Sequence, residues 1–233
     1  MSVTRVRQLP LLIRPTARVM GWGPPLWAAI PAALYVGTEA PDAFVDYRVQ
    51  VLRFGAMLLC MGGAFILDDP TEETIGHVPT PLVLRRGLRV ALLLPILALA
   101  WLGLVLLAGR VTTKAGGPLP VADLTLEAAT LLAIALCAAC LGTRLTSDRL
   151  GGVVAAPTVL ATVALAMLLP AQYKLLLPSV SDPRWDHVHD LWRIGLIGSL
   201  ATFLVLNRSP GARWNLSALP PKTRLRRREA DGR

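Results

Sequence analysis

The feature that most constrains the fold of this chain is a set of six apolar blocks, which are continuous and show neither a helical nor a strand period. The blocks at residues 90–109 and 150–173 contain no charged residue. Each is close to the ~20 residues with which a helix crosses ~30 Å of hydrocarbon. Because lipid cannot satisfy open backbone groups, such blocks must be helical. We therefore predict an all-α, polytopic membrane protein with six transmembrane helices, at residues 20–36, 51–67, 90–109, 124–143, 150–173 and 191–207.

Lysine and arginine residues are divided unevenly between the two sides that this topology defines. With six spans, both termini lie on one side, together with the loops at residues 68–89 and 144–149. Most of the 24 lysine and arginine residues fall on that side, in residues 5–18, in these loops and in the tail after Asn207. Since cytoplasmic loops carry the excess of positive charge, we predict that both termini are cytoplasmic.

The net charge of +9 could also indicate a nucleic-acid-binding protein. Here, however, the basic residues flank apolar blocks instead of forming one face with interleaved aromatic residues, so we exclude nucleic acid as a partner. The basic tail, residues 208–233, fits a juxtamembrane patch attracted to anionic lipid at about 1 kcal/mol per basic residue. A topology signal without a specific partner explains the tail equally well.

The chain divides into three segments. Residues 1–19 alternate basic and apolar side chains, as an interfacial helix does, although Pro10 and Pro15 should leave that helix short or broken. A plain cytoplasmic anchor is the alternative. Residues 20–207 form the transmembrane domain, so membrane lipids are expected partners, and residues 208–233 form the cytoplasmic tail.

Residue composition distinguishes the blocks from one another. The leucine-rich block at residues 90–109 suits a position facing lipid. The alanine-rich block at 124–143 and the Gly151-Gly152 pair permit close contact between helices. Cysteines in apolar surroundings are inert, and no acid or histidine accompanies the one C-x-x-C spacing. We therefore interpret all three cysteines as small packing residues: Cys60, Cys137 and Cys140.

The polar loop between the second and third blocks has the pattern of a short capped helix. Asp69 is a good N-cap residue, Pro70 occupies the favoured first position, and Glu72 completes a capping box. Gly76 and the prolines after it end the helix. The arginines that follow anchor the next span at the headgroups. We predict a short, rigid cytoplasmic helix; a solvated turn with no partner is the alternative.

This loop, the six spans, the amphipathic N-terminal lead and a partly apolar external segment at residues 174–190 together resemble the permease subunits of ABC-2 type ABC transporters, actinobacterial ones in particular. In sequence, the resemblance rests on residues 68–89, with their acidic residues, Pro79-Thr80-Pro81 and paired arginines. It implies that this loop is a coupling helix that docks on an ATP-binding cassette subunit, and that residues 174–190 form external re-entrant helices. The residues that would contact the ATPase are Asp68, Asp69, Glu72, Glu73, Ile75, Val78, Arg85 and Arg86.

The chain departs from a complete transporter because it contains no nucleotide-binding motif G-x-x-x-x-G-K-[ST]. ATP and Mg²⁺ are therefore expected in a separate subunit, and this chain should be neither an enzyme nor the holder of a cofactor. A short first block and the N-terminal prolines also depart from the family pattern. The expected function is the translocation path of an ATP-driven exporter, paired with a second permease copy or homologue. A membrane scaffold or accessory protein without transport activity is the alternative.

Three charged residues lie inside the blocks near their outer ends: Arg53, Glu127 and Arg193. Ionisable residues within a membrane are candidates for function. If Glu127 pairs with one of the two arginines, the pair could close the outer gate of a translocation path. Anchoring at the interface is the alternative, because long basic side chains can reach the headgroups. Trp185 and Trp192 are likewise placed as interface anchors.

The external segment ends in Asp186-His187-Val188-His189-Asp190. Histidines at i and i+2 share a face of a strand but not of a helix, and with the aspartates they could ligate zinc. His187 and His189 are therefore candidates for a metal site or for an external membrane enzyme. No nucleophile–base pair accompanies them, and a solvated end of the last span is the simpler interpretation, so we predict no metal.

Overall fold

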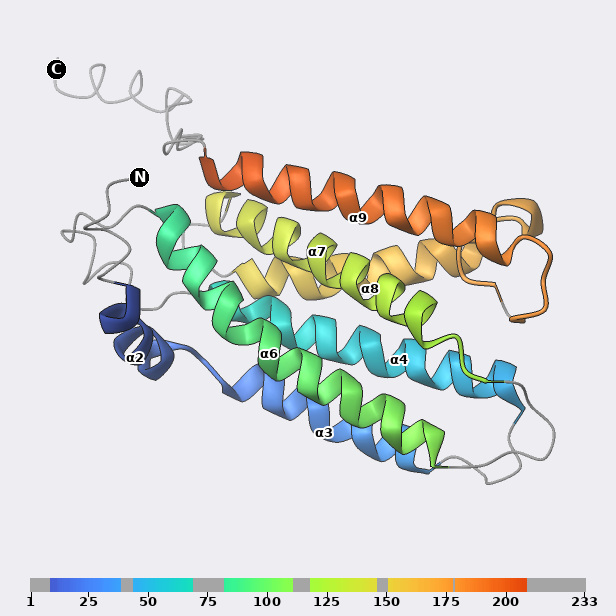
Figure 1. Cartoon of the computed structure of the whole chain (residues 1–233). Coiled ribbons are helices and arrows are strands. Elements are labelled where there is room, and N and C mark those ends of the chain that lie inside the picture. The colour runs from blue at the N-terminus through green and yellow to red at the C-terminus, as the bar shows by residue number, and fades with distance from the viewer. Residues whose placement is uncertain are drawn as a thin grey trace, which may run out of the picture.

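The computed structural model describes residues 9–38, 44–68, 82–110, 118–145, 151–177 and 179–208, and these residues form helices joined by turns, without strands (Figure 1). This confirms the prediction of an all-α fold. In chain order the elements are α2 (Leu9–Val19), α3 (Gly23–Gly37), α4 (Val45–Ala64), the 3-10 helix η1 (Phe65–Leu67), α6 (Leu82–Gly109), α7 (Val121–Leu145), α8 (Gly151–Leu168), the 3-10 helix η2 (Ala171–Tyr173) and α9 (Trp185–Arg208).

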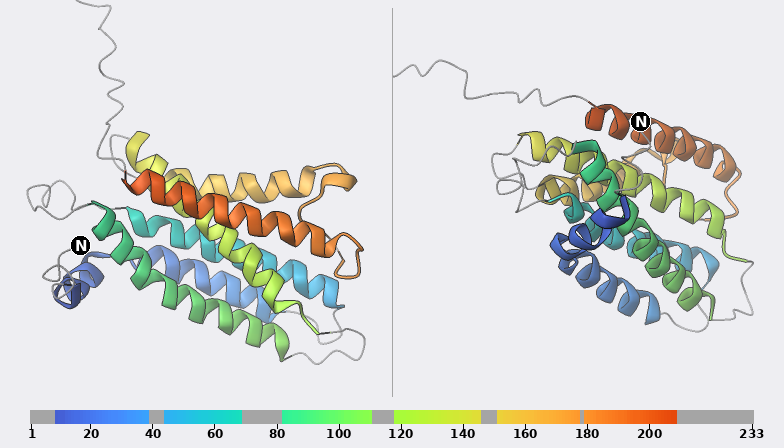
Figure 2. Two further views of the ribbon diagram at one scale, coloured as in Figure 1. Left: turned by 45° about the horizontal axis from the view of Figure 1, so that its top comes forward. Right: turned by 60° about the vertical axis from the view of Figure 1, so that its left-hand side comes forward.

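Successive long helices from α3 to α9 run in alternating directions (Figures 1 and 2). Side-chain hydrogen bonds show which ends meet. At one end, which we call the site end, Arg48 near the start of α4 donates to the carbonyl oxygen of Ala108 near the end of α6. At the other end, the loop end, Arg86 near the start of α6 donates to Thr143 near the end of α7. The described helices therefore form an up-and-down bundle.

In the described part of the chain, five helical segments are long and apolar enough to cross a membrane: Val45–Leu67, Leu84–Gly109, Val121–Leu145, Gly151–Leu168 and Trp185–Asn207. They mark the chain as a helical membrane protein. The remaining long helix of the bundle, α3, has 15 residues. At 1.5 Å per residue it extends about 22 Å, less than the ~30 Å of the hydrocarbon layer. The sixth span, and with it the placement of both termini in the cytoplasm, stays a prediction.

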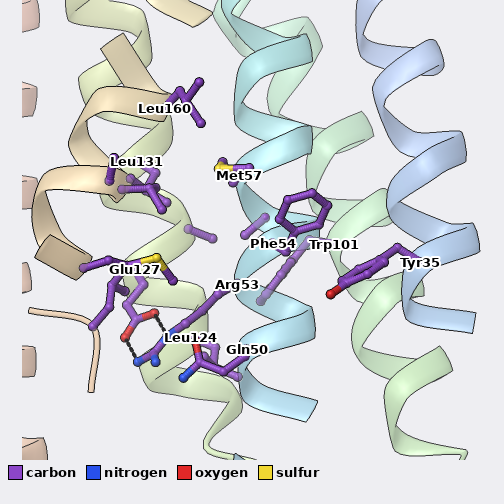
Figure 3. A pocket seen from close by; sticks show the side chains of 16 residues that line it. Tyr35, Gln50, Arg53, Phe54, Met57, Trp101, Leu124, Glu127, Leu131 and Leu160 are labelled. Atoms are coloured by element: carbon purple, nitrogen blue, oxygen red, sulfur yellow. Dashed lines mark hydrogen bonds and ion pairs between the residues drawn. The ribbon is translucent and has the colours of Figure 1, made fainter. Parts of the chain in front are cut away.

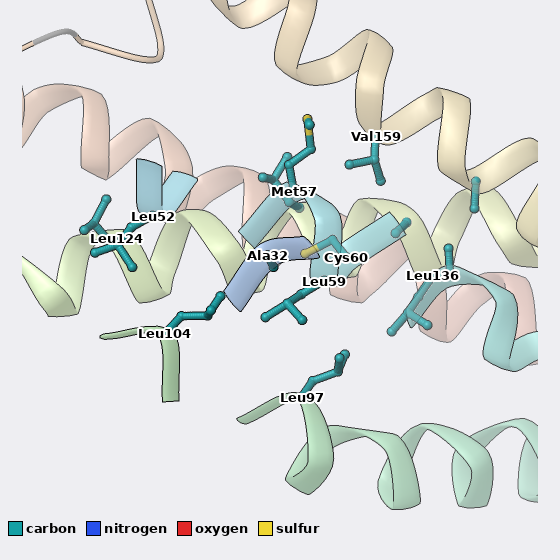
Figure 4. Close-up of a cluster of buried hydrophobic side chains, with 14 of the residues drawn as sticks. Ala32, Leu52, Met57, Leu59, Cys60, Leu97, Leu104, Leu124, Leu136 and Val159 are labelled. Atoms are coloured by element: carbon teal, nitrogen blue, oxygen red, sulfur yellow. The ribbon is translucent and has the colours of Figure 1, made fainter. Parts of the chain in front are cut away.

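The helices α4 and α7 form the centre of the bundle. In the most apolar stretch of α4, 72% of the residues are buried, and in that of α7 the share is 61%, whereas it is 17% in α6 and α9. Leu52, Leu59 and Cys60 of α4 belong to a core that also receives side chains from α3, α6, α7 and α8 (Figure 4). The leucine-rich block thus lies at the surface, as predicted, and the alanine-rich block lies in the centre.

Small residues allow η1, α7 and α8 to approach closely at the loop end. A Cβ atom on Gly152 would lie 2.2 Å from the ring of Phe65, and one on Gly151 would lie 2.5 Å from the carbonyl oxygen of Ala139. The close contact predicted for the start of the fifth block is confirmed. The three cysteines are free and buried within α4 and α7, where they pack as small side chains.

The structure corrects two predicted segments and agrees with a third. The fifth block ends as an α-helix at Leu168, because Pro170 disfavours helical backbone in the residue before it. The helix α2 is short, which is one of the two outcomes expected from the prolines, and it continues through Pro15. Residues 174–177 and 179–184 form no helix, so the re-entrant helices implied by the resemblance do not occur there.

Candidate functional site

A buried ion pair joins α4 to α7 at the site end. Arg53, on the third turn of α4, donates from Nε to Glu127 Oε2 at 2.7 Å and from Nη2 to Glu127 Oε1 at 2.6 Å (Figure 3). The two side chains are 8% and 3% exposed. Two parallel bonds of this kind are the strongest arrangement between a guanidinium and a carboxylate. Removing either residue alone would leave a buried charge without its partner.

His189 of α9 extends this pair to a third helix. Its Nε2 atom lies 3.1 Å from Glu127 Oε1, and its Nδ1 atom lies 2.8 Å from the carbonyl oxygen of Trp185. A carbonyl oxygen only accepts, so Nδ1 is the donor in that bond. The bond to Glu127 needs a second proton, between Nε2 and Oε1. Arg53, Glu127 and His189, which we call the charge cluster, therefore link α4, α7 and α9 through charge-assisted hydrogen bonds.

The site end also binds the backbone of the segment between η2 and α9. Arg53 donates from Nη1 to the carbonyl oxygen of Leu177 at 2.6 Å, and Gln50 Nε2 lies 3.3 Å from the same oxygen. The carboxylate of Asp46 accepts a bond from the N–H of Val180 at 2.9 Å. These backbone groups pair with α4 and not within a helix of their own, which explains why no re-entrant helix forms in this segment.

Two tryptophans pack inside the site end. The indole N–H of Trp185 donates to Asp123 at 2.8 Å, and its ring centroid lies 5.4 Å from the guanidinium carbon of Arg53 and 4.6 Å from the centroid of the His189 ring. The indole N–H of Trp192 donates to a carbonyl oxygen of the segment before α9. Both side chains are buried. They therefore hold the site end together and do not face lipid as interface anchors, which corrects the prediction.

The other candidates near this end lie apart from the charge cluster. Arg193 pairs with Asp190 on the surface of α9, where their side chains are 59% and 60% exposed. His187 is exposed although His189 is buried, because residues at i and i+2 point to different faces of a helix. Among the described residues, no group of three histidine, cysteine or carboxylate side chains could hold a metal ion.

A cavity of about 380 Å³ lies beside the charge cluster, lined by residues of α3, α4, α6, α7 and α8 and of the segment before α9. Gln50, Arg53 and Glu127 stand at one end of it, and aromatic and aliphatic side chains line the remainder (Figure 3). The volume is near the lower end of the roughly 300–1,000 Å³ of small-molecule sites. The cavity can hold a small ligand whose polar group reaches Arg53.

At the loop end, Asp68 joins the predicted coupling loop to the bundle. Its carboxylate accepts a hydrogen bond from the N–H of Gly152 in α8 at 2.8 Å, and Arg89 of α6 donates to its carbonyl oxygen at 3.1 Å. Desolvation raises the pKa of Asp68 above 3.8, although the N–H groups of Gly152 and Gly151 oppose the shift. The loop therefore leaves the bundle from a point that is bonded to two helices.

Of the other residues predicted to contact the ATPase, some belong to the described part of the chain and some do not. Arg85 and Arg86 belong to the first turns of α6, and Arg86 donates to Thr143 of α7 at 2.8 Å. The structure thus brings the described members of the set together at the loop end. Five members lie outside the described residues: Asp69, Glu72, Glu73, Ile75 and Val78.

Sequence reasoning missed several neighbours of the charge cluster, namely Gln50, Asp123 and Trp185. It interpreted His189 as part of a solvated end of the last span, with a metal site as the alternative. One feature of the sequence could have indicated part of this arrangement. Asp123 and Glu127 are spaced i, i+4, as are Trp185 and His189, so each pair shares one face of its helix. Nothing in the sequence indicates that these two faces meet each other.

No protein-family model matches this chain, and neither does any curated protein or any solved structure. The resemblance to ABC-2 permeases therefore stays a prediction.

Proposed function

We propose that this chain is the membrane-spanning subunit of an ATP-driven exporter. The observation that carries the proposal is the charge cluster, because it places three ionisable side chains, all buried, on membrane-spanning helices beside a cavity. Ionisable residues inside a membrane are costly and occur where substrates, ions or protons pass. A bundle that served only to anchor a complex would have no need of such a cluster next to an open cavity.

In this function the charge cluster is the outer gate. It ties α4 to α7 and α7 to α9, and through Leu177 it ties α4 to the segment that lies over the site end. Moving α4 away from α7 would break two bonds between Arg53 and Glu127 at once. A closed gate of this kind opens only when another process supplies the free energy to separate buried charges. The excess of arginine at the loop end supports placing the site end outside the cell.

The free energy would come from a separate ATP-binding cassette subunit docked on residues 69–81. Asp68 supports this assignment because it connects the first residue of the loop to α8, while Arg89 connects the same point to α6. A displacement of the loop would therefore act on two spanning helices. In this arrangement both termini are cytoplasmic, the membrane is the bacterial plasma membrane, and a second copy of the chain or a homologue completes the transporter.

Co-purification tests the proposal. We expect tagged wild-type chain, extracted from its native membrane, to retain an ATP-binding cassette protein, and Glu72→Lys/Glu73→Lys to lose it while the permease stays folded. The matched control is Asp186→Lys/Asp190→Lys, which makes the same charge change on exposed residues of α9 at the site end. Retention of the ATPase by the loop variant would refute the coupling role. Recovery of other partners without any ATPase would favour a membrane scaffold.

A further inference from the structure

The cavity beside the charge cluster changes character along its length. One end is polar and is formed by Gln50, Arg53 and Glu127 (Figure 3). Apart from the hydroxyl group of Tyr35, the remainder is lined by apolar side chains, which include Phe54, Met57, Trp101, Leu131, Leu160 and Met167. A molecule that fills this space must be apolar over most of its length and polar at one end.

The order of these two parts matches the order of groups in a membrane leaflet. The helix α4 begins at Val45 at the site end, and Arg53 is eight residues further along, which corresponds to about 12 Å at 1.5 Å per residue. The span Val45–Leu67 has 23 residues and is about 34 Å long, so the polar end of the cavity lies nearer the site end of the span than the other end. From there the apolar part runs toward the middle of the spanning helices, where acyl chains lie.

The cavity opens on the side of the bundle. Phe54 is 41% exposed, Leu160 is 51% exposed and Met167 is 52% exposed, and all three belong to helices that are candidate spans. Tyr35 of α3 packs against Phe54, with 4.8 Å between ring centroids. A molecule dissolved in the bilayer can therefore enter between exposed apolar side chains without passing through the charge cluster.

At the polar end, the positive charge of Arg53 is already paired with the negative charge of Glu127. Arg53 donates three hydrogen bonds, two to Glu127 and one to Leu177, and a guanidinium has further N–H groups to offer. A carboxylate or phosphate head would lie beside Glu127, and an ammonium head would lie beside Arg53. Either would place like charges together away from water, where their repulsion is strong. A hydroxyl or ester group can accept from Arg53 and Gln50 without adding a charge.

We propose that this cavity binds an uncharged single-chain amphiphile, with its hydroxyl or ester head at Arg53 and Gln50 and its chain toward Leu160. The volume of about 380 Å³ equals roughly 13 water-sized volumes of about 30 Å³, which suits one short chain and not two. This inference rests on the proposed function for the side of the membrane and for the role of the molecule as cargo. The binding itself needs no ATPase.

Photolabelling in the absence of any ATPase tests the binding. The purified chain in phosphatidylcholine nanodiscs is labelled with 1-decanoylglycerol that carries a diazirine on its chain, and the labelled residues are mapped by mass spectrometry. The competitors are 1-decanoylglycerol, decanoate, decylammonium and dodecane. We expect label on α4 and α8, and at least tenfold stronger competition by 1-decanoylglycerol than by the other three. Equal competition by a charged or headless probe would overturn the proposal.

Two substitutions on one helix provide a matched control. Ala164 of α8 lines the cavity, whereas Ala161, which is also exposed, does not. We expect Ala164→Trp to reduce labelling at least tenfold and Ala161→Trp to leave it unchanged. Gln50→Leu gives a second test that does not depend on filling the cavity. It should weaken competition by 1-decanoylglycerol about fivefold, as the loss of one hydrogen bond of about 1 kcal/mol predicts, and leave dodecane unaffected.

The outcomes of this experiment are separate from those of the co-purification. Unchanged labelling of Ala164→Trp would show that the probe binds elsewhere on the bundle and would overturn the assignment of the cavity, even if an ATPase co-purifies. Labelling that follows the predicted pattern would support the cavity even if no ATPase is found, and the proposed function alone would then fail.

Discussion

Replacing Glu127 with leucine should be the most damaging single change at the site end. The substitution leaves two donor groups of Arg53 and one nitrogen of His189 buried without an acceptor. A hydrogen bond to a charged group contributes about 1.5–3 kcal/mol, so the two bonds from Arg53 amount to about 3–6 kcal/mol. Breaking a buried pair costs about 3–5 kcal/mol in soluble proteins.

In a bilayer, the cost of losing these hydrogen bonds is lower than in a soluble protein. In the unfolded state the helices stay inserted in the membrane, and their polar groups find other hydrogen-bond partners there. Measured bonds between membrane helices average about 0.6 kcal/mol, which gives about 2 kcal/mol for the three contacts of Glu127. We therefore expect Glu127→Leu to lower the free energy of unfolding by about 2–5 kcal/mol. Titration with SDS in mixed micelles, followed by tryptophan fluorescence, measures that free energy.

Two further variants identify the cause of the loss. Arg193→Leu breaks an ion pair whose side chains are 59% and 60% exposed, and it should change the free energy of unfolding by less than about 1 kcal/mol. Arg53→Met/Glu127→Leu removes both members of the ion pair. It should recover most of the stability lost in Glu127→Leu, apart from the contribution of the contact with His189. Equal, small losses in Glu127→Leu and Arg193→Leu would refute the claim that the charge cluster is buried and paired.

Three other predictions concern the loop end and the core. Gly152→Ala should destabilise the bundle by about 1–3 kcal/mol through overpacking against Phe65, whereas Gly198→Ala, with no atom within 4 Å of the new Cβ, should not; unfolding titrations compare the two. Because burial raises the pKa of Asp68, its charged form opposes folding, so wild-type stability relative to Asp68→Asn should fall as pH rises from about 3.8 through the raised pKa; a constant difference would contradict this. N-ethylmaleimide should leave the buried thiols of Cys60, Cys137 and Cys140 unlabelled in nanodiscs and label them in SDS, with Ser181→Cys, which is exposed in the segment before α9, as the control labelled in both.

The positions of most helices, and part of their packing, could be predicted from the sequence. Charge-free blocks near 20 residues permit only a spanning helix, and their composition separates the surface helix α6 from the central helix α7. The two segments that were predicted wrongly, the end of the fifth span and the external segment after it, deviate because of hydrogen bonding and backbone restrictions. The helix α8 stops before Pro170, and the segment after η2 is irregular because its backbone bonds the side chains of Asp46 and Arg53.

The charge cluster could be predicted only in part. Arg53 and Glu127 stand out because they are charges within apolar blocks, and their pairing was one of two arrangements that the sequence allowed. Arg193 has the same signal, yet it lies on the outward face of α9. Which face of a spanning helix turns inward depends on contacts between segments more than sixty residues apart, as for Glu127 and His189. Hydrophobicity alone does not specify that rotation when lipid and protein are both apolar.

The central claim, that the charge cluster is an outer gate opened by ATP, is tested most directly by access to Leu176. This residue lines the cavity, lies in the segment over the site end and is 8% exposed. In a chain without other cysteines, co-purified with its ATPase and reconstituted, Leu176→Cys is treated from outside with a membrane-impermeant maleimide. We predict slow labelling without nucleotide and at least tenfold faster labelling with ATP and Mg²⁺. Equal rates under both conditions would contradict the gate.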